Sequence, residues 1–241
     1  MSQPIALVTG GAVRIGAAIV KELLHQGCLV LLQYYSSDTE AKAIQKEHGD
    51  SVRLFQADLS DSRSVLELIS SVKSAFPRLD YLVNNAGIIR TEELSAISES
   101  SFEQMMQINA HAPLLLLQGL QDCLEKGIGS VVNIVDNCSD SRPWQRHSSY
   151  AASKAALLSM TRSLAVELAP TIRINAVGPG TIHCGSKDPL DTVRADLLSK
   201  IPMERWGRPE EVAESVYFLL SGPRYITGQV LYVDGGWSIK A

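Results

Sequence analysis

Short apolar runs of strand length alternate along this chain with longer stretches of helical period, and this alternation limits the folds it can adopt. The strand-like runs lie at residues 5–8, 29–33, 52–57, 81–83, 130–135, 172–177 and 229–233. The main helix-like stretches lie at about 15–27, 38–48, 99–125 and 150–168, with another from 209. Strands that alternate with helices form a parallel sheet covered by helices on both faces. We therefore predict a doubly wound α/β fold.

The chain of 241 residues contains no linker, internal repeat or low-complexity stretch, so we predict one domain spanning residues 1–241. The segment at about 181–206 is irregular and longer than an ordinary connection between a strand and a helix. Connections of this length are often lids or binding loops. We therefore predict a substrate loop at about 181–206.

Charge and cysteine content exclude several classes of function. The formal net charge is −4, without the clustered basic residues that nucleic-acid binding requires. Apolar runs are too short to cross a bilayer, and no signal-peptide pattern follows the first residue. The four cysteines are widely spaced and form no metal-binding motif. We expect a cytoplasmic protein with reduced thiols that binds no metal, membrane or nucleic acid.

A glycine-rich turn, TGGAVRIG at 9–16, follows the first strand and opens the first helix. Gly10, Gly11 and Gly16 allow the backbone to turn tightly and to approach a ligand closely. The helix that follows directs free N–H groups and the positive end of its dipole at an anion. This context predicts a dinucleotide-binding site.

The end of the second strand distinguishes between the two nicotinamide dinucleotides. An acidic residue there would bind the ribose 2′-hydroxyl of NAD, but the chain reads QYYSS at 33–37, with no acid before Asp38. Arg14 in the glycine turn is placed to face a 2′-phosphate, and Ser36 and Ser37 are placed to donate hydrogen bonds to it. We therefore predict NADP(H) as the cofactor, in preference to NAD(H).

Tyr150 and Lys154 lie four residues apart in a helical stretch, so both side chains share one helix face. A tyrosine hydroxyl ordinarily ionises at about pH 10, and a nearby ammonium favours the phenolate. We therefore predict that Lys154 lowers the pKa of Tyr150. Tyr150 would then act as a general acid in reduction and as a general base in oxidation.

Together these motifs resemble the short-chain dehydrogenase/reductase family over nearly the whole chain. They are TGGAVRIG at 9–16, Asp58, NNAG at 84–87, Asn109, Tyr150 with Lys154, VGPG at 177–180 and VDGG at 233–236. The resemblance implies a Rossmann-type parallel sheet of seven strands and a homotetramer. It implies that Lys154 also holds the nicotinamide ribose and that Asn109 holds a water connecting Lys154 to solvent.

The resemblance also supplies a set of expected cofactor contacts. These residues are Gly10, Arg14, Ile15, Gly16, Tyr35, Ser36, Ser37, Asp58, Leu59, Asn84, Asn85, Ala86, Gly87, Tyr150, Lys154, Pro179, Gly180 and Ile182. Asp58 is expected near the adenine, and Pro179, Gly180 and Ile182 around the nicotinamide.

The serine that usually orients the substrate carbonyl in this family is missing. Counted from Asn133 along the strand, Asp136 takes its place. Counted back from Tyr150, the family's usual spacing of thirteen points to Asn137 instead, because Asp136 lies fourteen residues before Tyr150. We favour Asp136, since loops absorb insertions more readily than strands.

An ionised aspartate accepts hydrogen bonds but donates none, so it suits a substrate with N–H groups, unless burial keeps it protonated. Pteridine reductases, a branch of the family, carry Asp at this place, Arg in the glycine turn and a similar VGPG. The chain resembles them in these three places, which implies NADPH-dependent reduction of a pterin C=N bond. It departs from them at Gly87 and at Ile89, where they usually have serine and a pterin-stacking phenylalanine. We predict substrate contacts from Ile89, Asp136 and Trp206.

Two other functions remain open at this point. ERWGRPEEVAESVYFLL and YITGQVLYVDGG, at 204–220 and 225–236, resemble 3-oxoacyl thioester reductases. Arg142, Arg146, Arg205 and Arg208 are then candidates for a basic docking patch. The missing serine also motivates a function without turnover, as an NADP(H)-binding sensor or scaffold. The leading hypothesis is a short-chain reductase that transfers hydride from NADPH to a small-molecule C=O or C=N bond.

Overall fold

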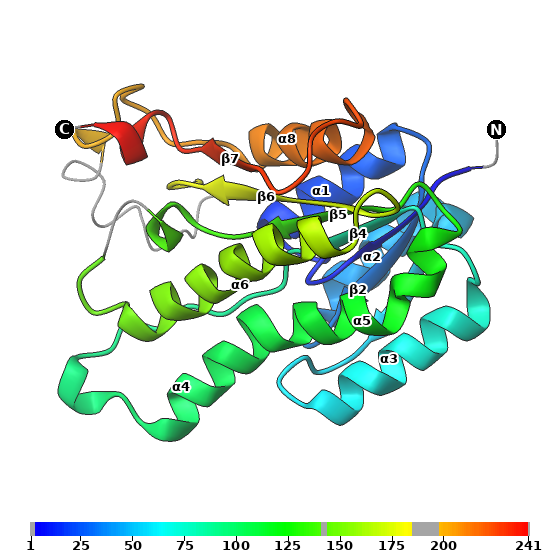
Figure 1. The fold of residues 1–241 in the computed structure, drawn as a ribbon, viewed down its shortest axis with the longest axis horizontal. Coiled ribbons are helices and arrows are strands. Elements are labelled where there is room, and N and C mark those ends of the chain that lie inside the picture. Colours follow the sequence, from blue (N-terminus) through cyan, green and yellow to red (C-terminus); the bar gives the residue numbers. More distant parts are fainter. Residues whose placement is uncertain (1–2, 141–143, 185–197, 241) are drawn as a thin grey trace.

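The computed structural model describes residues 3–140, 144–184 and 198–240, and its strands form one parallel sheet (Figure 1). The strands are β1 (Ile5–Val8), β2 (Leu29–Tyr34), β3 (Val52–Gln56), β4 (Tyr81–Asn84), β5 (Ser130–Ile134), β6 (Arg173–Pro179) and β7 (Val230–Val233). Their order in the sheet is β3-β2-β1-β4-β5-β6-β7. The predicted Rossmann-type sheet of seven strands is therefore confirmed.

The helices cover both faces of this sheet. They are α1 (Arg14–His25), α2 (Asp38–His48), α3 (Ser62–Ala75), α4 (Glu99–Met106), α5 (Ala112–Glu125), α6 (Ser148–Glu167) and α8 (Pro209–Ser221). Figure 1 shows α1 and α8 above the sheet and α3, α4, α5 and α6 below it. No helix in the described ranges is both long and apolar enough to span a membrane.

Successive residues of a strand pack into two separate hydrophobic cores, one on each face of the sheet. In β1, Ala6 and Val8 pack with α1 and α8 on one face, whereas Leu7 packs with α3 and α5 on the other. All three side chains are fully buried. Burial on both faces explains why the strands read as continuous apolar runs rather than as alternating ones.

The register brings the carboxyl ends of the central strands together. Val8 of β1 lies beside Val83 of β4, Asn84 pairs with Asn133 of β5, and Ile134 pairs with Val177 of β6. The loops that follow these strands therefore leave the sheet at one edge. The order of the strands reverses between β1 and β4, and ligands of open α/β sheets bind at such a reversal.

The Asn84 side chain takes part in a chain of buried hydrogen bonds. Its side-chain amide donates to Asn133 Oδ1 at 2.8 Å, and Asn133 donates to Thr161 Oγ1 of α6 at 2.8 Å. Both asparagines are buried. This chain of bonds ties β4 and β5 to α6. Asn84 is not part of the described cleft lining, and its contact with the cofactor stays a prediction.

The long helix predicted at about 99–125 has the right limits but is not continuous. A π-helical turn, Gln107–His111, separates α4 from α5. The fully buried Asn109 lies in this turn, and its side chain bonds to both backbone groups of Ile88. Such turns often occur at functional sites, and apolar periodicity does not reveal them.

The single-domain assignment stays a prediction. The substrate loop predicted at about 181–206 also stays a prediction, because residues 185–197 lie outside the described ranges.

The contact between α3 and α5 is tight at Gly119. A Cβ at this position would lie 2.7 Å from two carbons of Ile69 in α3. We expect Gly119→Ala to lower the free energy of unfolding by about 1–3 kcal/mol through overpacking. Urea denaturation of Gly119→Ala, Ile69→Ala and the double variant checks this. The free energy of unfolding of the double variant should exceed the value expected from adding the two single losses by at least about 1 kcal/mol. Additive losses would contradict the proposed clash.

Candidate active site

A cleft of about 500 Å³ opens at the carboxyl edge of the sheet, where the loops after β1, β2, β4, β5 and β6 meet. It brings together most of the residues predicted from the sequence. These are Gly10, Arg14, Ile15, Gly16, Tyr35, Ser36, Ser37, Asp58, Leu59, Asn85, Ala86, Gly87, Ile89, Asp136, Tyr150, Lys154, Pro179, Gly180 and Ile182. Their individual roles stay predictions.

Other lining residues were not predicted. They are Ala12, Val13, Gln33, Tyr34, Ile88, Ile108, Ile134, Val135 and Cys184. Gln33 is the most informative of them, because its buried side chain accepts from the Gly10 amide at 2.9 Å and donates to the Ala57 carbonyl at 2.8 Å. A polar residue within an otherwise apolar strand was the available signal for it.

Glycine is required at two positions of the turn. Gly10 has φ +61°, and a Cβ at Gly16 would lie 2.1 Å from the Gly10 carbonyl oxygen. The turn therefore leaves its backbone open at the start of α1, where free amides attract an anion. The cleft continues from this turn to Tyr150. An open cradle at a helix start, continuous with a Tyr–Lys pair, fits a nicotinamide dinucleotide.

The loop after β4 is locked against the loop after β1. Thr9 Oγ1 accepts from the amides of Asn85 and Ala86, each at 3.0 Å. The Asn85 side chain donates to the carbonyls of Thr9 and Gly10, at 2.9 and 3.1 Å. Asn85 thus supports the glycine turn while it lines the cleft, and its neighbour Asn84 does not.

At the far end of the cleft lie the residues that would distinguish the two dinucleotides, of which Arg14 and Ser36 are exposed and Ser37 is half-buried. Arg14 has φ +52° and lines the cleft with Ser36 and Ser37. Asp38 is occupied elsewhere, since it accepts from Tyr34 Oη at 3.0 Å and pairs with Lys42 at 2.7 Å. The hydrogen bond from Lys42 lowers the pKa of Asp38. The described cleft lining thus places Asp58, but no acid of β2 or its loop, at this end.

Three ionisable side chains meet at the other end of the cleft. Tyr150 Oη donates to Asp136 Oδ2 at 2.8 Å, and Lys154 Nζ donates to the Ile134 carbonyl at 2.7 Å. Tyr150 and Lys154 are 7% and 4% exposed. As predicted, both point from one face of α6 toward the end of β5.

The electrostatics at Tyr150 differ from the prediction. Burial and the adjacent Asp136 carboxylate raise the pKa of Tyr150 well above its ordinary value. Burial also lowers the pKa of Lys154 to about 8, although Asp136 acts in the opposite direction. The prediction that Lys154 lowers the pKa of Tyr150 is therefore wrong for the protein alone. A phenolate beside the Asp136 carboxylate would place two negative charges in a buried site.

The geometry answers which residue replaces the serine. Asp136 lines the cleft and contacts Tyr150, whereas Asn137 is fully buried and is not part of the described lining. A 3-10 turn, Asn137–Ser139, begins directly after Asp136. The count along the strand therefore identifies the right residue, and the extra residue before Tyr150 falls in the connection between β5 and α6.

Asn109 and Trp206 lie outside the cleft as the described residues define it. The Asn109 amide donates to Ser153 Oγ and to the Ile88 carbonyl, each at 2.9 Å, so it fixes the backbone next to Gly87. Its predicted role in holding a water stays untested. A Cβ at Gly87 would lie 3.3 Å from Lys154 Nζ, so this backbone also abuts the lysine.

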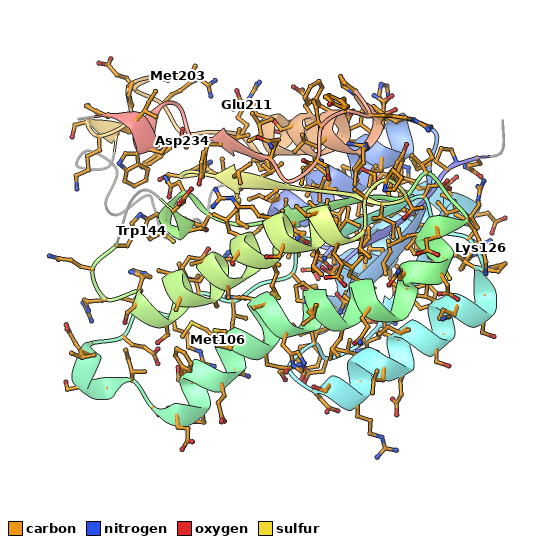
Figure 2. The ribbon with its side chains drawn as sticks, viewed as in Figure 1. Met106, Lys126, Trp144, Met203, Glu211 and Asp234 are labelled. Atoms are coloured by element: carbon orange, nitrogen blue, oxygen red, sulfur yellow. The ribbon has the colours of Figure 1, made fainter. Side chains whose placement is uncertain are left out.

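Trp206 belongs to an aromatic cluster rather than to the described cleft wall. It is 8% exposed and packs with Ile201 and Trp237. Trp144 stacks on Trp237 with ring centroids 5.9 Å apart, and Figure 2 shows Trp144 at the opposite end of the molecule from Lys126. The prediction that Trp206 contacts substrate therefore has no support from the described residues. Ile89, which is 50% exposed, does line the cleft.

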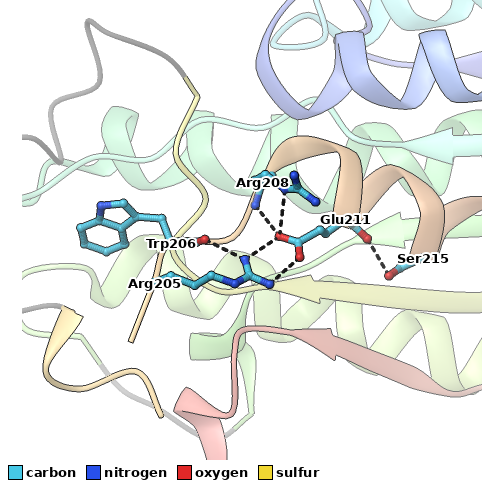
Figure 3. Close-up of polar contacts among 5 residues, drawn as sticks. All are labelled: Arg205, Trp206, Arg208, Glu211 and Ser215. Atoms are coloured by element: carbon cyan, nitrogen blue, oxygen red, sulfur yellow. Dashed lines mark hydrogen bonds and ion pairs between the residues drawn. The ribbon is translucent and has the colours of Figure 1, made fainter. Parts of the chain in front are cut away.

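Three of the four arginines considered for a docking patch form ion pairs, and the fourth, Arg142, lies outside the described residues. Arg205 binds both carboxylate oxygens of Glu211, at 2.6 and 3.0 Å, and its hydrogen bond lowers the pKa of Glu211 to about 2. The Arg208 amide also donates to Glu211, at the start of α8 (Figure 3). Arg146 pairs with Glu93 at 2.9 Å. Glu211 organises the entry into α8, which offers a structural reason for the motif around it.

A glycine-rich turn and a Tyr–Lys pair in one cleft define an NAD(P)-dependent oxidoreductase of the short-chain type. The family model described as "Enoyl-(Acyl carrier protein) reductase" matches residues 11–238. The chain thus belongs to the short-chain dehydrogenase/reductase family, as the sequence motifs predict.

Named relatives cover nearly the whole chain. An NAD-dependent glycerol dehydrogenase of Listeria innocua is 33% identical over 100% of this chain and 96% of its own length. A 3-oxoacyl-[acyl-carrier-protein] reductase FabG of Staphylococcus aureus is 35% identical over 96% of each chain. The crystal structure of a blue fluorescent protein from a metagenomic library, in complex with NADPH, superposes with a TM-score of 0.90. That protein is 35% identical to this chain, and the match covers 98% of both.

The lowered pKa of Lys154 has a consequence for stability. The folded protein holds this proton less tightly than the unfolded chain, so folding is penalised below about pH 8, and the penalty fades as pH rises toward 10.5. We expect Lys154→Met to raise the free energy of unfolding at pH 7 by about 1–3 kcal/mol and to abolish activity. The stability gain should shrink above about pH 8.

Urea denaturation at several pH values measures this effect. Lys21→Met, at an exposed position of α1, serves as the control and should change stability by less than about 0.5 kcal/mol. A Lys154→Met protein that is less stable than the wild type at pH 7 would contradict the argument.

Proposed function

We propose that this protein is an NADP(H)-dependent reductase acting on a C=N or C=O bond of a small molecule, and that its preferred substrate presents an N–H group to Asp136. One observation carries the proposal, the 2.8 Å hydrogen bond from Tyr150 to Asp136 inside the cleft. It puts a carboxylate where most of the family has a hydroxyl donor. A flat heterocycle with a C=N bond beside an N–H group, as in dihydropterins, has the required chemistry.

The carboxylate discriminates between substrate types because its ionised form only accepts hydrogen bonds. A carbonyl oxygen placed against Asp136 would meet a negative charge and find no donor. A ring N–H placed there would gain a charge-assisted hydrogen bond. The expected preference is therefore for substrates that carry a donor next to the reducible bond.

Tyr150 supplies the proton. The dinucleotide, when bound, supplies the hydride to the substrate carbon. Tyr150 Oη gives its proton to the nitrogen or oxygen of the reduced bond, so that C=N becomes CH–NH. The raised pKa of Tyr150 opposes this transfer as long as no substrate donor is bonded to Asp136. A substrate N–H bonded to Asp136 weakens that opposition, so binding of the preferred substrate makes Tyr150 a stronger acid.

The choice of NADP(H) is supported by exposed Arg14 beside Ser36 and Ser37 and by the engagement of Asp38 with Tyr34 and Lys42. The structurally similar blue fluorescent protein was crystallised with NADPH. The Listeria relative, in contrast, is named for NAD dependence.

A 3-oxoacyl thioester reductase is the second candidate, and one observation favours it. Several relatives with 33–35% identity over nearly the full chain are named 3-oxoacyl-[acyl-carrier-protein] reductases. Against it stands Asp136, which would repel the keto oxygen. A sensor without turnover is disfavoured because family membership and the paired Tyr150 and Lys154 point to an oxidoreductase. A homotetramer remains our inference from the family resemblance, to be tested by light scattering, and a cytoplasmic location remains our inference from the cysteine content.

Replacement of Asp136 separates the candidate substrates. We expect Asp136→Ser to reduce kcat/KM for a 7,8-dihydropterin by about 10- to 100-fold, the value of a hydrogen bond to a charged group. The same change should leave kcat/KM for an acetoacetyl thioester unchanged or increased. Initial rates of NADPH oxidation give both values.

Asp140→Asn serves as the control, since Asp140 is an exposed residue paired with Arg162. It should alter neither rate by more than about twofold. Equal effects of Asp136→Ser on both substrates would refute the selectivity assigned to Asp136. Binding of NADPH without reduction of either substrate by the wild type would instead favour the sensor.

Arg14 provides the test of cofactor choice. We expect Arg14→Asn to raise the dissociation constant for NADPH by about 10- to 30-fold and to change that for NADH by less than about threefold. Asparagine is chosen because it tolerates a positive φ. Arg146→Asn is a matched control, since Arg146 also has a positive φ and is exposed. Fluorescence titration measures both constants, and equal weakening for both cofactors would contradict contact with a 2′-phosphate.

A further inference from the structure

We propose that Ser139 is a positioning residue that holds Asp136 in the orientation in which it binds Tyr150. The inference rests on the proposed function for its effect on substrates but not for its effect on Tyr150. It concerns the short turn that connects β5 to the rest of the site, which none of the family motifs includes.

Ser139 and Asp136 bond to each other through reciprocal contacts. The Asp136 amide donates to Ser139 Oγ at 3.0 Å, and the Ser139 amide donates to the Asp136 carbonyl at 3.1 Å. The two residues bracket the 3-10 turn Asn137–Ser139 in the arrangement of a capping box. This arrangement fixes the backbone of Asp136, and with it the direction in which the side chain leaves the strand.

The carboxylate itself is held by two different partners. Oδ1 accepts from the Cys138 amide at 2.9 Å, and Oδ2 accepts from Tyr150 at 2.8 Å. The Cys138 amide belongs to the turn that Ser139 closes. One carboxylate oxygen is therefore occupied by the turn, which directs the other to Tyr150 and the cleft.

Loss of the Ser139 hydroxyl would remove the side-chain acceptor of the Asp136 amide. The start of the turn would then be free to rotate, and the Cys138 amide would move with it. Asp136 would keep its charge but lose its fixed direction. We therefore expect Ser139→Ala to weaken the Tyr150–Asp136 hydrogen bond and to reduce the preference for N–H-bearing substrates over carbonyl substrates.

The hydrogen bond can be observed without substrate or cofactor. In protein labelled with ¹³Cζ-tyrosine, the Tyr150 signal is assigned by its loss in Tyr150→Phe, and Asp136→Ala gives its position without the carboxylate. We expect Ser139→Ala to move the signal at least about half of the way toward the Asp136→Ala position. Ser139→Thr, which keeps the hydroxyl, should restore it. Ser139→Cys offers a weaker acceptor and a second variant if the alanine protein does not fold.

Ser98→Ala is the matched control. Ser98 Oγ likewise accepts from a backbone amide, that of Ser101 at 3.1 Å, but Ser98 is exposed at the start of α4. It should lower stability and leave the Tyr150 signal in place. An unmoved signal in both Ser139→Ala and Ser139→Cys would overturn the positioning role.

The substrate readout distinguishes this inference from the proposed function. Ser139→Ala should lower the ratio of dihydropterin to acetoacetyl thioester kcat/KM by about 5- to 20-fold, and Ser139→Thr should restore it. A moved signal with an unchanged ratio would leave Ser139 as a positioning residue and refute the selectivity assigned to Asp136. A changed ratio with an unmoved signal would overturn the positioning role.

Discussion

Burial of the sheet on both faces is the constraint on which the rest of this structure depends. Because apolar residues fill most of both faces of the central strands, the side chains that can face a ligand gather where the strands end. The register places the ends of β1, β4, β5 and β6 at one edge, so the glycine turn, Asn85, Asp136 and the end of α6 meet there. Hydrogen bonds such as that from the Asn85 amide to Thr9 Oγ1 then hold the loops together. The site is thus a product of the topology, and its chemistry is decided by the few side chains at that edge.

The fold could be predicted from the sequence because burial of the sheet on both faces produces local patterns of apolar residues. Runs of apolar residues located all seven strands, and α2 spans the predicted residues 38–48. The interruption at Asn109 escaped prediction because apolar periodicity does not reveal a π-helical turn, and the bonds of Asn109 there are to Ile88, a residue distant in the sequence. Asn84 and Asn85 were assigned together, although only the second faces the cleft. Neighbouring strand residues point to opposite sides, and a motif match does not tell which of them faces a ligand.

The pKa of Tyr150 shows the limit of reasoning from residue types alone. The presence of Lys154 suggested a lowered value, but the sign depends on burial and on what else lies nearby. Lys154 gives its hydrogen bond to the Ile134 carbonyl, whereas Tyr150 gives its own to Asp136. The replacement of a serine by aspartate therefore does more than remove a donor. It places a carboxylate beside the Tyr150 hydroxyl, and this carboxylate contributes to a raised pKa of Tyr150 where the sequence predicted a lowered one.

The contact with Asp136 links the pKa of Tyr150 to ligand binding. Tyr150 donates to Asp136 at 2.8 Å, so a ligand that donates a hydrogen bond to Asp136 stabilises the carboxylate and makes the Tyr150 proton easier to release. By thermodynamic reciprocity, loss of that proton must in turn strengthen the attraction between the site and the ligand's donor. A ligand without a donor makes no hydrogen bond to Asp136 and gains no such coupling. Under the proposed function, the unfavourable charge arrangement of the free protein selects substrates that carry a donor, because their hydrogen bond to Asp136 makes Tyr150 a stronger acid.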